Sequence, residues 1–473
     1  MSIRRSDRYD LVIVGIGSGG TVAAEFAAEH LGLRVAAVER ARIGGDCLWT
    51  GCIPSKTLLA CARAVHGMGE HDQVEITSVW PSVRRRIATV QADIAATDDD
   101  PERFRKMGVD LIEGTAVVTG PHEVTVDDRV LSTRFVLVCT GGRPARPPIR
   151  GIDDIEVFTS ENLFTLEQPP SSLIVLGGGP VGCEISQALT RLGIEITLVE
   201  MADRLLANDE PAHASRLLRV LRAEGVDVRL GATAAGVTGS NDGIVLTIEG
   251  GETITARGLF AATGRVPHTA SLGLDELGIA VGATGVAVDD RSRTSQHSIY
   301  VVGDANDRPD FTHVAAYDAV LAVRDMFLPG RGRVPRVVPW CTFTDPEVAH
   351  VGLTESEAIE RHGARRVEVH RHDLTDSDRA RTDGTTDGEI VVVTARGRIV
   401  GGHAICPHAG ELIHELALAI HAGLRMADIA QMIHVYPTFS SGIGQLAAQN
   451  SYRTARRYRM FARVGRLRPG ALR

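Results

Sequence analysis

Two cysteines and a lysine near the start of this 473-residue chain have the types and spacing of a redox site. Cys47 and Cys52 lie within Gly44–Lys56, whose sequence is GGDCLWTGCIPSK. In a reducing compartment, a closely spaced pair of cysteines is more often redox-active or metal-binding than structural. Lys56 and Lys106 are the only two lysines among 51 basic residues, which indicates that a compact ammonium is needed beside the pair.

The composition limits the classes of protein that can carry this site. Hydrophobic residues make up 44% and charged residues 23%, as in globular proteins, and the length predicts two to four domains. A net charge of −8 argues against nucleic acid as the main partner. No apolar run reaches membrane-spanning length, and the N-terminus enters a strand-like LVIVG without a signal-peptide pattern. We therefore expect a cytoplasmic protein without a nucleic-acid or membrane partner, and the loosely spaced histidines predict no metal site.

The segment before the cysteines has the pattern of a dinucleotide-binding unit. An apolar strand at 11–14 leads into a glycine-rich turn and a helix from Thr21, and a second strand at 34–38 ends in an acid. Such glycines let backbone N–H groups at a helix N-terminus approach a pyrophosphate, and the acid accepts hydrogen bonds from a ribose. The residues that carry this pattern are Gly15, Gly17, Gly20 and Glu39.

The same pattern occurs a second time. Strands at 173–176 and 195–199 flank another glycine-rich turn and helix, with nearly equal internal spacing. Its corresponding residues are Gly177, Gly179, Gly182 and Glu200. Two such patterns predict two nucleotide-binding domains.

Further patterns set the domain boundaries. An apolar strand, a Thr-Gly turn and a proline follow one another in both Val136–Pro144 and Phe260–Pro267. A later apolar strand ends in Gly303-Asp304, where the acid can bind a polyol. Residues 61–106 are expected to be helical, with interruptions near Pro81 and at 98–100. We expect an α/β protein with two Rossmann-like domains and an α+β C-terminal domain. The predicted segments are 1–150, 151–270, 271–335 and 336–473. The resemblance described next implies that they are, in this order, the first part of an FAD-binding domain, an NAD-binding domain, the return to the FAD-binding domain and a dimerisation domain.

Together these features resemble the class I pyridine nucleotide-disulfide oxidoreductases, which include dihydrolipoamide dehydrogenase, glutathione reductase and mercuric reductase. The most specific part is Gly44–Lys56, which is similar to that family's redox-active disulfide segment beside the flavin. The resemblance implies FAD at the first pattern, NAD(P)H at the second and a homodimer through the third domain. The cofactor-binding positions that it implies are Gly15, Gly17, Gly20, Glu39, Gly45, Lys56, Ala116, Thr140, Gly141, Asp304, Thr312, Gly177, Gly179, Gly182, Glu200 and Gly264.

The resemblance also implies the catalytic roles. Cys52 matches the cysteine beside the flavin, Cys47 the thiol that meets the acceptor, and Lys56 a lysine near the flavin with Glu184 as its carboxylate partner. An ammonium there is sensible, because reduced flavin and a thiolate both carry negative charge. Glu200 favours NADH over NADPH, since a carboxylate repels a 2′-phosphate.

One stretch departs from the family pattern. Where disulfide reductases carry a histidine and a glutamate, this chain has Tyr436 and Ser441, while His434 lies two residues upstream. Whether Tyr436 or His434 replaces the base stays open, as does the acceptor. The leading hypothesis is an NADH-oxidising FAD enzyme that passes a hydride through a Cys47–Cys52 disulfide to a small-molecule or metal-ion acceptor. The alternatives are an Hg(II) or soft-metal reductase, and a quinone reductase or redox-sensing flavoprotein without a disulfide substrate.

Overall fold

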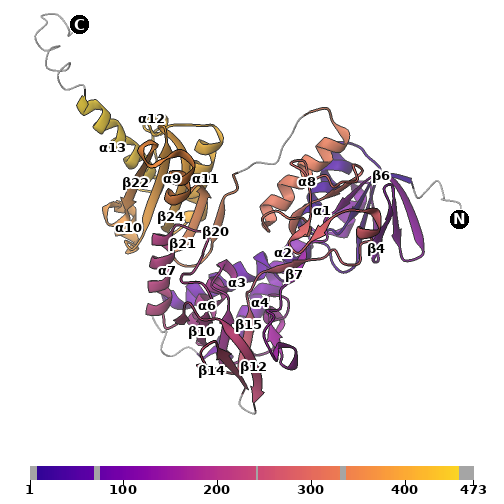
Figure 1. The fold of residues 1–473 in the computed structure, drawn as a ribbon, viewed down its shortest axis with the longest axis horizontal. Helices are drawn as coiled ribbons and strands as arrows, with labels where there is room; N and C mark the ends of the chain where they lie inside the picture. The colour runs from indigo at the N-terminus through magenta and orange to yellow at the C-terminus, as the bar shows by residue number, and fades with distance from the viewer. Residues whose placement is uncertain (1–7, 69–74, 241–242, 331–336, 458–473) are drawn as a thin grey trace, which may run out of the picture. The chain divides into compact units, whose positions relative to one another are not determined.

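The computed structural model describes residues 8–68, 75–240, 243–330 and 337–457, and the chain forms two compact units (Figure 1). Unit 1 is built from Met1–Gly177, Ala188–Ile196 and Thr233–Arg336, and unit 2 from Gly178–Gln187, Thr197–Ala232 and Val337–Arg473. Both units combine helices with sheets, which confirms the predicted α/β class. Over the described ranges, no helix has the length and apolar character needed to span a bilayer.

The main sheet of unit 1 has a parallel centre. Its order is β3-β2-β1-β6-β5-β4, with β19 also paired to β6. Leu11 and Ile13 of β1 contact one apolar cluster, whereas Val12 and Val14 contact another, so the strand is buried on both faces. Burial on both faces explains the continuous apolar run in the sequence. The strands are β1 (Arg8–Val14), β2 (Val35–Glu39), β3 (Val109–Glu113), β4 (Ala116–Gly120), β5 (Glu123–Val126), β6 (Arg129–Val138) and β19 (Ile299–Val301).

The helices of unit 1 agree with the expected pattern except at Pro81. This residue lies inside α4, so the predicted interruption there is wrong. Trp80 beside it is fully buried, and its indole N–H donates to the carbonyl oxygen of Leu166 at 2.9 Å. We infer that this packing outweighs the roughly 3 kcal/mol that a proline costs inside a helix. The helices are α1 (Ser18–Glu25), the π-helical η2 (Phe26–His30), α2 (Gly45–Trp49), α3 (Cys52–Gly67), α4 (Ile76–Ala95), α5 (Pro101–Lys106) and α8 (Thr312–Phe327).

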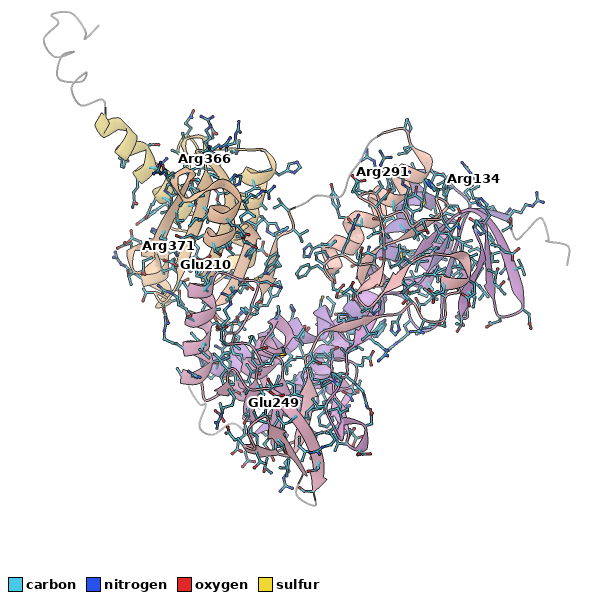
Figure 2. The ribbon with its side chains drawn as sticks, in the orientation of Figure 1. Arg134, Glu210, Glu249, Arg291, Arg366 and Arg371 are labelled. Atoms are coloured by element: carbon cyan, nitrogen blue, oxygen red, sulfur yellow. The ribbon has the colours of Figure 1, made fainter. Side chains whose placement is uncertain are left out.

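Two short strands bring the similar Thr-Gly segments together. β7 (Gly142–Pro144) and β16 (Arg265–Pro267) pair in antiparallel fashion, with Val266 opposite Arg143. The remaining elements of unit 1 are η4 (Ile152–Asp154), β8 (Val157–Phe158), η5 (Leu163–Thr165), β9 (Ser172–Leu176), β12 (Ala234–Ser240), β13 (Gly243–Ile248), β14 (Thr253–Ala256), β15 (Gly258–Ala261), η6 (Asp275–Leu277), β17 (Val281–Gly282), β18 (Gly285–Val286) and η7 (Gly303–Ala305). Figure 2 labels Arg134 and Arg291 of this unit, which pair with Asp10 at 3.1 Å and with Asp325 at 2.6 Å.

Unit 2 contains an antiparallel sheet of order β20-β21-β24-β23-β22. Helices α11 and α13 pack on one face of it around a large apolar cluster. Thr354 caps α9 through a capping box with Glu357, as its sequence predicts. The strands are β20 (Trp340–Thr342), β21 (Glu347–Gly352), β22 (Val367–Asp373), β23 (Glu389–Ala395) and β24 (Arg398–Cys406). The helices are α9 (Glu355–His362), η8 (Ala364–Arg366), η9 (Leu374–Asp376), α10 (Asp378–Asp383), α11 (Ala409–His421), α12 (Met426–Ile429) and α13 (Ser441–Arg457).

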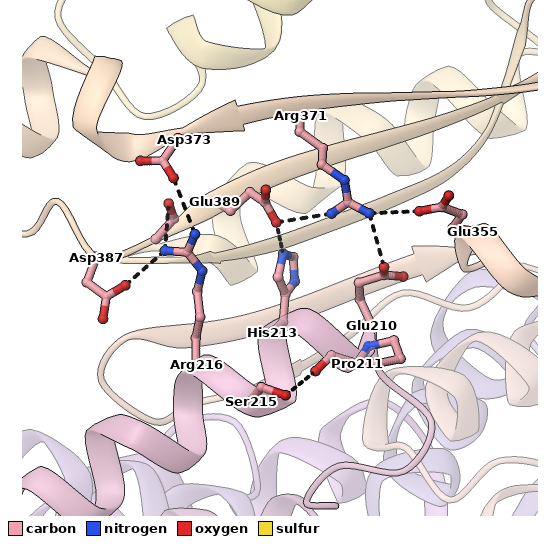
Figure 3. Close-up of polar contacts among 11 residues, drawn as sticks. Glu210, Pro211, His213, Ser215, Arg216, Glu355, Arg371, Asp373, Asp387 and Glu389 are labelled. Carbon is pink, nitrogen blue, oxygen red and sulfur yellow. Dashed lines mark hydrogen bonds and ion pairs between the residues drawn. The ribbon is translucent and has the colours of Figure 1, made fainter.

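Elements of the second nucleotide-binding pattern continue into unit 2. They are α6 (Pro180–Arg191), β10 (Glu195–Val199), α7 (Pro211–Ala223) and β11 (Asp227–Arg229). A charged network joins α7 to the sheet (Figure 3). Arg371 contacts Glu210, Glu355 and Glu389 at 3.5, 2.8 and 3.2 Å, and the buried His213 ring lies 3.4 Å from Glu389. Although burial acts to raise it, the contact with His213 and the charge of Arg371 hold the pKa of Glu389 below its ordinary value.

Replacing Arg371 should destabilise unit 2 in a pH-dependent way. Arg371→Met leaves Glu389 and Glu210 without their cation, while their side chains stay only 12% and 6% exposed. Because the Arg371 side chain is itself 37% exposed, we expect a loss of about 2 kcal/mol of unfolding free energy at pH 7. When the pKa of a carboxyl is lower in the folded than in the unfolded protein, its ionised form stabilises the fold at pH values above the unfolded pKa. This stabilisation is lost as the pH falls through the folded pKa. Urea unfolding should therefore show the variant approaching wild type as the pH drops below about 4. The exposed Arg366→Met is the matched control, and an equal deficit at pH 7 and pH 4 would contradict the electrostatic explanation.

Candidate active site

Two short helical segments position the cysteine pair in unit 1. Cys47 lies in the middle of α2, and Cys52 is the first residue of α3. Gly44 and Gly45 before them have φ values of 91° and 56°, which favour glycine. A Cβ on Gly45 would lie 2.8 Å from the Cα of Gly17, so the cysteine segment packs directly on the first glycine-rich turn.

The structure brings the Cys47 and Cys52 side chains into contact without a disulfide between them. A hydrogen bond between the Cys47 and Cys52 side chains is the main cause of the raised pKa of Cys47, and burial adds to it. Hydroxyls of Thr312 and Ser18 act in the opposite direction. The Cys52 Sγ also lies 3.4 Å from the Thr312 Oγ1, at the first residue of α8. The ionisation of each thiol of the predicted pair therefore depends on the other thiol. The hydroxyl of Thr312, at the start of α8, lies beside them.

A cavity of about 420 Å³ opens next to this pair. The predicted residues that line it are Gly15, Gly17, Glu39, Gly45, Cys47, Ala116, Thr140, Gly141, Asp304 and Thr312. Gly20, Lys56 and Cys52 are outside its lining. Gly20 has another reason to be glycine, because a Cβ there would lie 2.1 Å from the carbonyl oxygen of Gly15.

Each nucleotide pattern holds its acid in the same way. The Glu39 carboxylate accepts from the N–H groups of Ile16 and Ala41 at 2.8 and 2.9 Å. In unit 2, the Glu200 carboxylate accepts from those of Gly178 and Ala202 at 2.5 and 2.7 Å. Backbone donors thus fix both carboxylates where a ribose diol would bind. The predicted Gly179 and Gly182 share unit 2 with Glu200, whereas Gly177 and Gly264 belong to unit 1.

The remaining predicted catalytic residues are divided between the units. Lys56 lies on α3 of unit 1, and Glu184 lies in unit 2, where its Oε1 accepts from the N–H of Phe343 at 2.9 Å. Their pairing stays a prediction. In unit 2, Tyr436 is 66% exposed and its hydroxyl donates to the Asp378 carboxylate at 2.8 Å. That hydrogen bond and the charge of Asp378 raise the pKa of the tyrosine.

The histidine near Tyr436 faces a different environment. His434 Nε2 lies 2.9 Å from Glu415 Oε1, and its side chain is 9% exposed. Its ring packs against Gly444, where a Cβ would come within 2.6 Å of Nδ1. Between the two candidates for the missing base, Tyr436 is the one that unit 2 presents to solvent. The Arg-rich stretch 452–473 lies mostly outside the described residues.

Residue spacing alone did not identify several contacts around the cysteine segment. Trp49 Nε1 donates to the Ile43 carbonyl at 2.7 Å, and the Arg42 guanidinium lies 4.1 Å from the Trp49 ring centroid. Gln91 of α4 donates to the carbonyl oxygens of Leu48 and Trp49, both at 2.9 Å. Arg265 makes a further contact, because its Nη2 donates to Asp46 Oδ2. The sequence around Arg265 predicted only that a strand ends there. Gln91 and Arg265 lie about 40 and about 220 residues from α2 in the sequence. Arg42 and Ile43 lie close to α2 but carry no motif of their own.

The space around Gly17 shows whether the cavity can hold FAD. A Cβ on Gly17 would meet no chain atom closer than 3.7 Å, so packing within the chain does not require glycine there. Gly17 lines the cavity next to α1, and its missing side chain leaves room for a group bound by the turn. With the fixed Glu39 carboxylate and Asp304 in the same lining, the residues present fit FAD.

Comparison with known proteins gives consistent matches over almost the whole chain. The family model described as pyridine nucleotide-disulphide oxidoreductase matches residues 9–319, and that of its dimerisation domain matches residues 338–447. The chain is 31% identical to a glutathione reductase of Burkholderia cepacia, covering 91% of this chain and 97% of that protein. It is 33% identical to a mercuric reductase of Streptomyces lividans, covering 93% and 96%.

A solved structure gives a similar match. The HOCl-induced flavoprotein disulfide reductase RclA from Escherichia coli superposes with a TM-score of 0.84 at 26% identity, covering 93% of this chain and 99% of that one. A Cu(II) complex of RclA is similar as well, with a TM-score of 0.83.

Gly17→Val should separate flavin binding from folding. Its side chain would enter the cavity rather than the protein core, so we expect an unchanged far-UV circular dichroism spectrum but a loss of most bound flavin, measured by absorbance at 450 nm per chain. Gly20→Val is the contrasting variant, because its side chain would collide with the backbone of Gly15 and should reduce soluble folded protein. A Gly17→Val protein with full flavin content would show that the cavity is not the flavin site.

Proposed function

We propose that this chain, which belongs to the pyridine nucleotide-disulphide oxidoreductase family, oxidises NADH and delivers the electrons through Cys47 and Cys52 to a small-molecule or metal-ion acceptor. The family matches confirm the resemblance inferred from the sequence, and with it an oxidoreductase that uses FAD and NAD(P)H. The lining residues Gly17, Glu39 and Asp304 would hold FAD, which would supply two-electron transfer chemistry between the nicotinamide and the cysteine pair. The observation that carries the proposal is the contact between the Cys47 and Cys52 side chains beside the cavity.

The two thiols take different parts in this proposal. The side-chain contact with Cys52 raises the pKa of Cys47, so Cys47 holds its proton more tightly than an ordinary thiol. The Cys52 Sγ lies 3.4 Å from the Thr312 hydroxyl. A tightly held proton on Cys47 supports Cys47 as the thiol that meets the acceptor and Cys52 as the cysteine nearer the flavin. Lys56 and Glu184 keep their proposed role of balancing the charge.

Tyr436, which stands where disulfide reductases carry their histidine base, belongs to unit 2. The dimerisation-domain match supports a homodimer, and we infer that dimerisation brings the exposed Tyr436 surface to the other copy's thiols. Because Asp378 raises the pKa of Tyr436, the phenol stays protonated near neutral pH and is suited to donate a proton rather than accept one. Ordinary disulfides need a base at this point, so their reduction should be slow.

Soft-metal reduction is the second candidate function. Two thiols in contact form a ligand pair for a soft metal ion, which prefers thiolates. The match to a mercuric reductase and the similarity to a Cu(II) complex of RclA support this candidate. Both candidate functions use Cys47 and Cys52, and they differ only in the electron acceptor that Cys47 contacts.

The fixed carboxylate of Glu200 supports NADH as the electron donor. Both of its oxygens accept backbone N–H groups, which hold the negative charge where a 2′-phosphate would lie.

An acceptor panel with cysteine variants tests the proposed function. Wild type, Cys47→Ser and Cys52→Ser should be assayed with NADH and NADPH against lipoamide, glutathione disulfide, Hg(II) with excess thiol, and a quinone. We expect NADH to be preferred and both variants to lose at least about 100-fold in turnover with the physiological class of acceptor, because each serine breaks the thiol pair. Cys61→Ser, on the same helix as Cys52, is the matched control and should retain activity. Wild-type turnover of Cys52→Ser with every accepted substrate would contradict the proposal, and full quinone reduction by Cys47→Ser would favour the flavin-to-quinone alternative.

The Tyr436–Asp378 pair predicts a specific pH effect. Asp378→Asn removes the charge that raises the pKa of Tyr436, so the alkaline limb of the pH–rate profile should move to lower pH. Tyr436→Phe should lose that limb together with about 10- to 100-fold in turnover. Asp383→Asn, on the same helix α10 and paired instead with Arg379, serves as the control. An alkaline limb that is identical in wild type and Asp378→Asn would exclude Tyr436 as the titrating acid.

A further inference from the structure

A chain of hydrogen bonds within unit 2 ties the segment after Glu200 to the second glycine-rich turn. The Gly178 N–H donates to the Glu200 carboxylate, and the Gly178 carbonyl oxygen accepts from the N–H of Leu206 at 3.0 Å. The Leu206 carbonyl oxygen in turn accepts from the N–H of Asp209 at 2.9 Å. The placement of the Glu200 carboxylate is therefore connected to the way in which residues 201–209 are held.

The far end of this segment is a buried carboxylate. Asp209 is 3% exposed, and its Oδ1 accepts from Trp340 Nε1 at 3.0 Å. The indole stacks on the ring of His350, which is opposite Trp340 in the pairing of β20 with β21, with 3.8 Å between the ring centroids and 9° between the planes. The sheet of unit 2 thus offers Asp209 a donor whose position is fixed by stacking.

The backbone at Leu206 shows that the segment is held under strain. Its φ is 45°, a left-handed conformation that is an outlier for a bulky residue, and its side chain is 2% exposed. Such a conformation costs free energy and persists only where surrounding contacts maintain it. The hydrogen bonds from Leu206 to Gly178 and from Asp209 to Leu206 are contacts of this kind. Weakening the contact at Asp209 should therefore allow the segment to open.

The charge on Asp209 changes close to neutral pH. Burial raises the pKa of Asp209 to about 6, although the hydrogen bond from Trp340 and the charge of Arg204 act to lower it. A carboxyl whose pKa is higher in the closed segment than in water binds its proton more tightly in the closed form. Ionisation as the pH rises through about 6 therefore favours opening, because opening returns the carboxylate to water.

The groups that face Asp209 from neighbouring elements do not titrate in this range. The Cys183 thiol of α6 donates to the Gly178 carbonyl oxygen at 3.4 Å, and burial and nearby carboxylates, Asp209 among them, raise its pKa. Burial lowers the pKa of His350, behind the indole, to about 4. On the side of α7, Glu210 Oε1 lies 3.5 Å from Arg371 Nη2. Neither the thiol nor the imidazole adds a charge near pH 6, where Asp209 titrates.

We propose that Asp209 and Trp340 form a pH-sensitive latch, which holds residues 201–209 closed and thereby positions the Glu200 carboxylate for the ribose of the bound nucleotide. The inference rests on the proposed function, in which Glu200 binds that ribose. Asp209 is a positioning residue, because it acts on Glu200 through Leu206 and Gly178. The step that weakens the latch is the release of one proton from the Asp209 carboxyl to solvent, so nucleotide affinity should be higher below pH 6 than above it.

Hydrogen exchange tests the latch without any ligand. Exchange of the amides of residues 200–210 is measured by mass spectrometry between about pH 5 and about pH 7.5 and corrected for the intrinsic effect of pH on exchange. In wild type, protection should fall by about threefold or more with a midpoint near pH 6, whereas Asp209→Asn should keep the same protection throughout. Trp340→Phe should move the midpoint upward, because the ionised carboxylate loses a donor. Asp203→Asn, which removes an exposed acid from the same segment, is the matched control and should behave like wild type.

Binding of ADP-ribose connects the latch to the nucleotide site. This probe carries the ribose but transfers no hydride, so calorimetry with the FAD-containing protein follows binding alone. Wild-type affinity should be about threefold or more higher at pH 5 than at pH 7.5, and Asp209→Asn should bind equally at both.

The outcomes separate the latch from the proposed function. Protection that does not change with pH in wild type, or that changes equally in Asp209→Asn, would overturn the proposal, as would pH-dependent protection with an ADP-ribose affinity that is independent of pH. Where Asp209→Asn does not fold, Trp340→Phe decides, since an unmoved midpoint there contradicts the latch. Failure of wild type to bind ADP-ribose at either pH would count against the nucleotide site of the proposed function, while the exchange result still decides whether the latch exists.

Discussion

The hydrogen bond between the Cys47 and Cys52 side chains is the contact on which the proposed chemistry depends. It raises the pKa of Cys47, and it requires side chains from two different helices to meet. The break between α2 and α3 at Gly51 makes this possible, because it lets Cys52 begin a new helix instead of continuing the first. Most neighbouring features follow from holding that geometry, including the left-handed Gly44 and Gly45 and the hydrogen bonds from Gln91.

Negative charge is the second constraint. The Asp46 and Asp304 carboxylates line the same cavity, where partial burial makes like charges repel more strongly than in water. Arginines in the same lining, Arg40, Arg42, Arg143 and Arg265, supply positive charge there. Arg265 reaches two carboxylates and a backbone carbonyl at once, and Lys56 lies one turn along α3 from Cys52. An arginine fork serves where several acceptors must be held, whereas the retained lysine suits a single developing charge.

Local patterns in the sequence predicted much of the fold and several of the residues that line the cavity. Apolar runs such as Leu11–Val14, the glycine spacing and the capping box at Thr354 depend on neighbours within a few residues, and all three correspond to observed elements. Pro81 shows the limit of local propensity, because the tertiary packing of Trp80 keeps the helix intact. Arg265 with Asp46 and Tyr436 with Asp378 are 219 and 58 residues apart, and no period or motif indicates such partners. The sequence departs from the family pattern at Tyr436 and Ser441, and the structure shows that the Tyr436 hydroxyl donates to Asp378.

We expect electrons from NADH to reach the Cys47–Cys52 pair. The most direct test is to count reactive thiols in the oxidised flavoprotein before and after anaerobic addition of NADH, and to locate them by peptide mass spectrometry. Two additional thiols per chain should appear, at Cys47 and Cys52. A flavin that is reduced by NADH with no gain of thiols at these positions would contradict it.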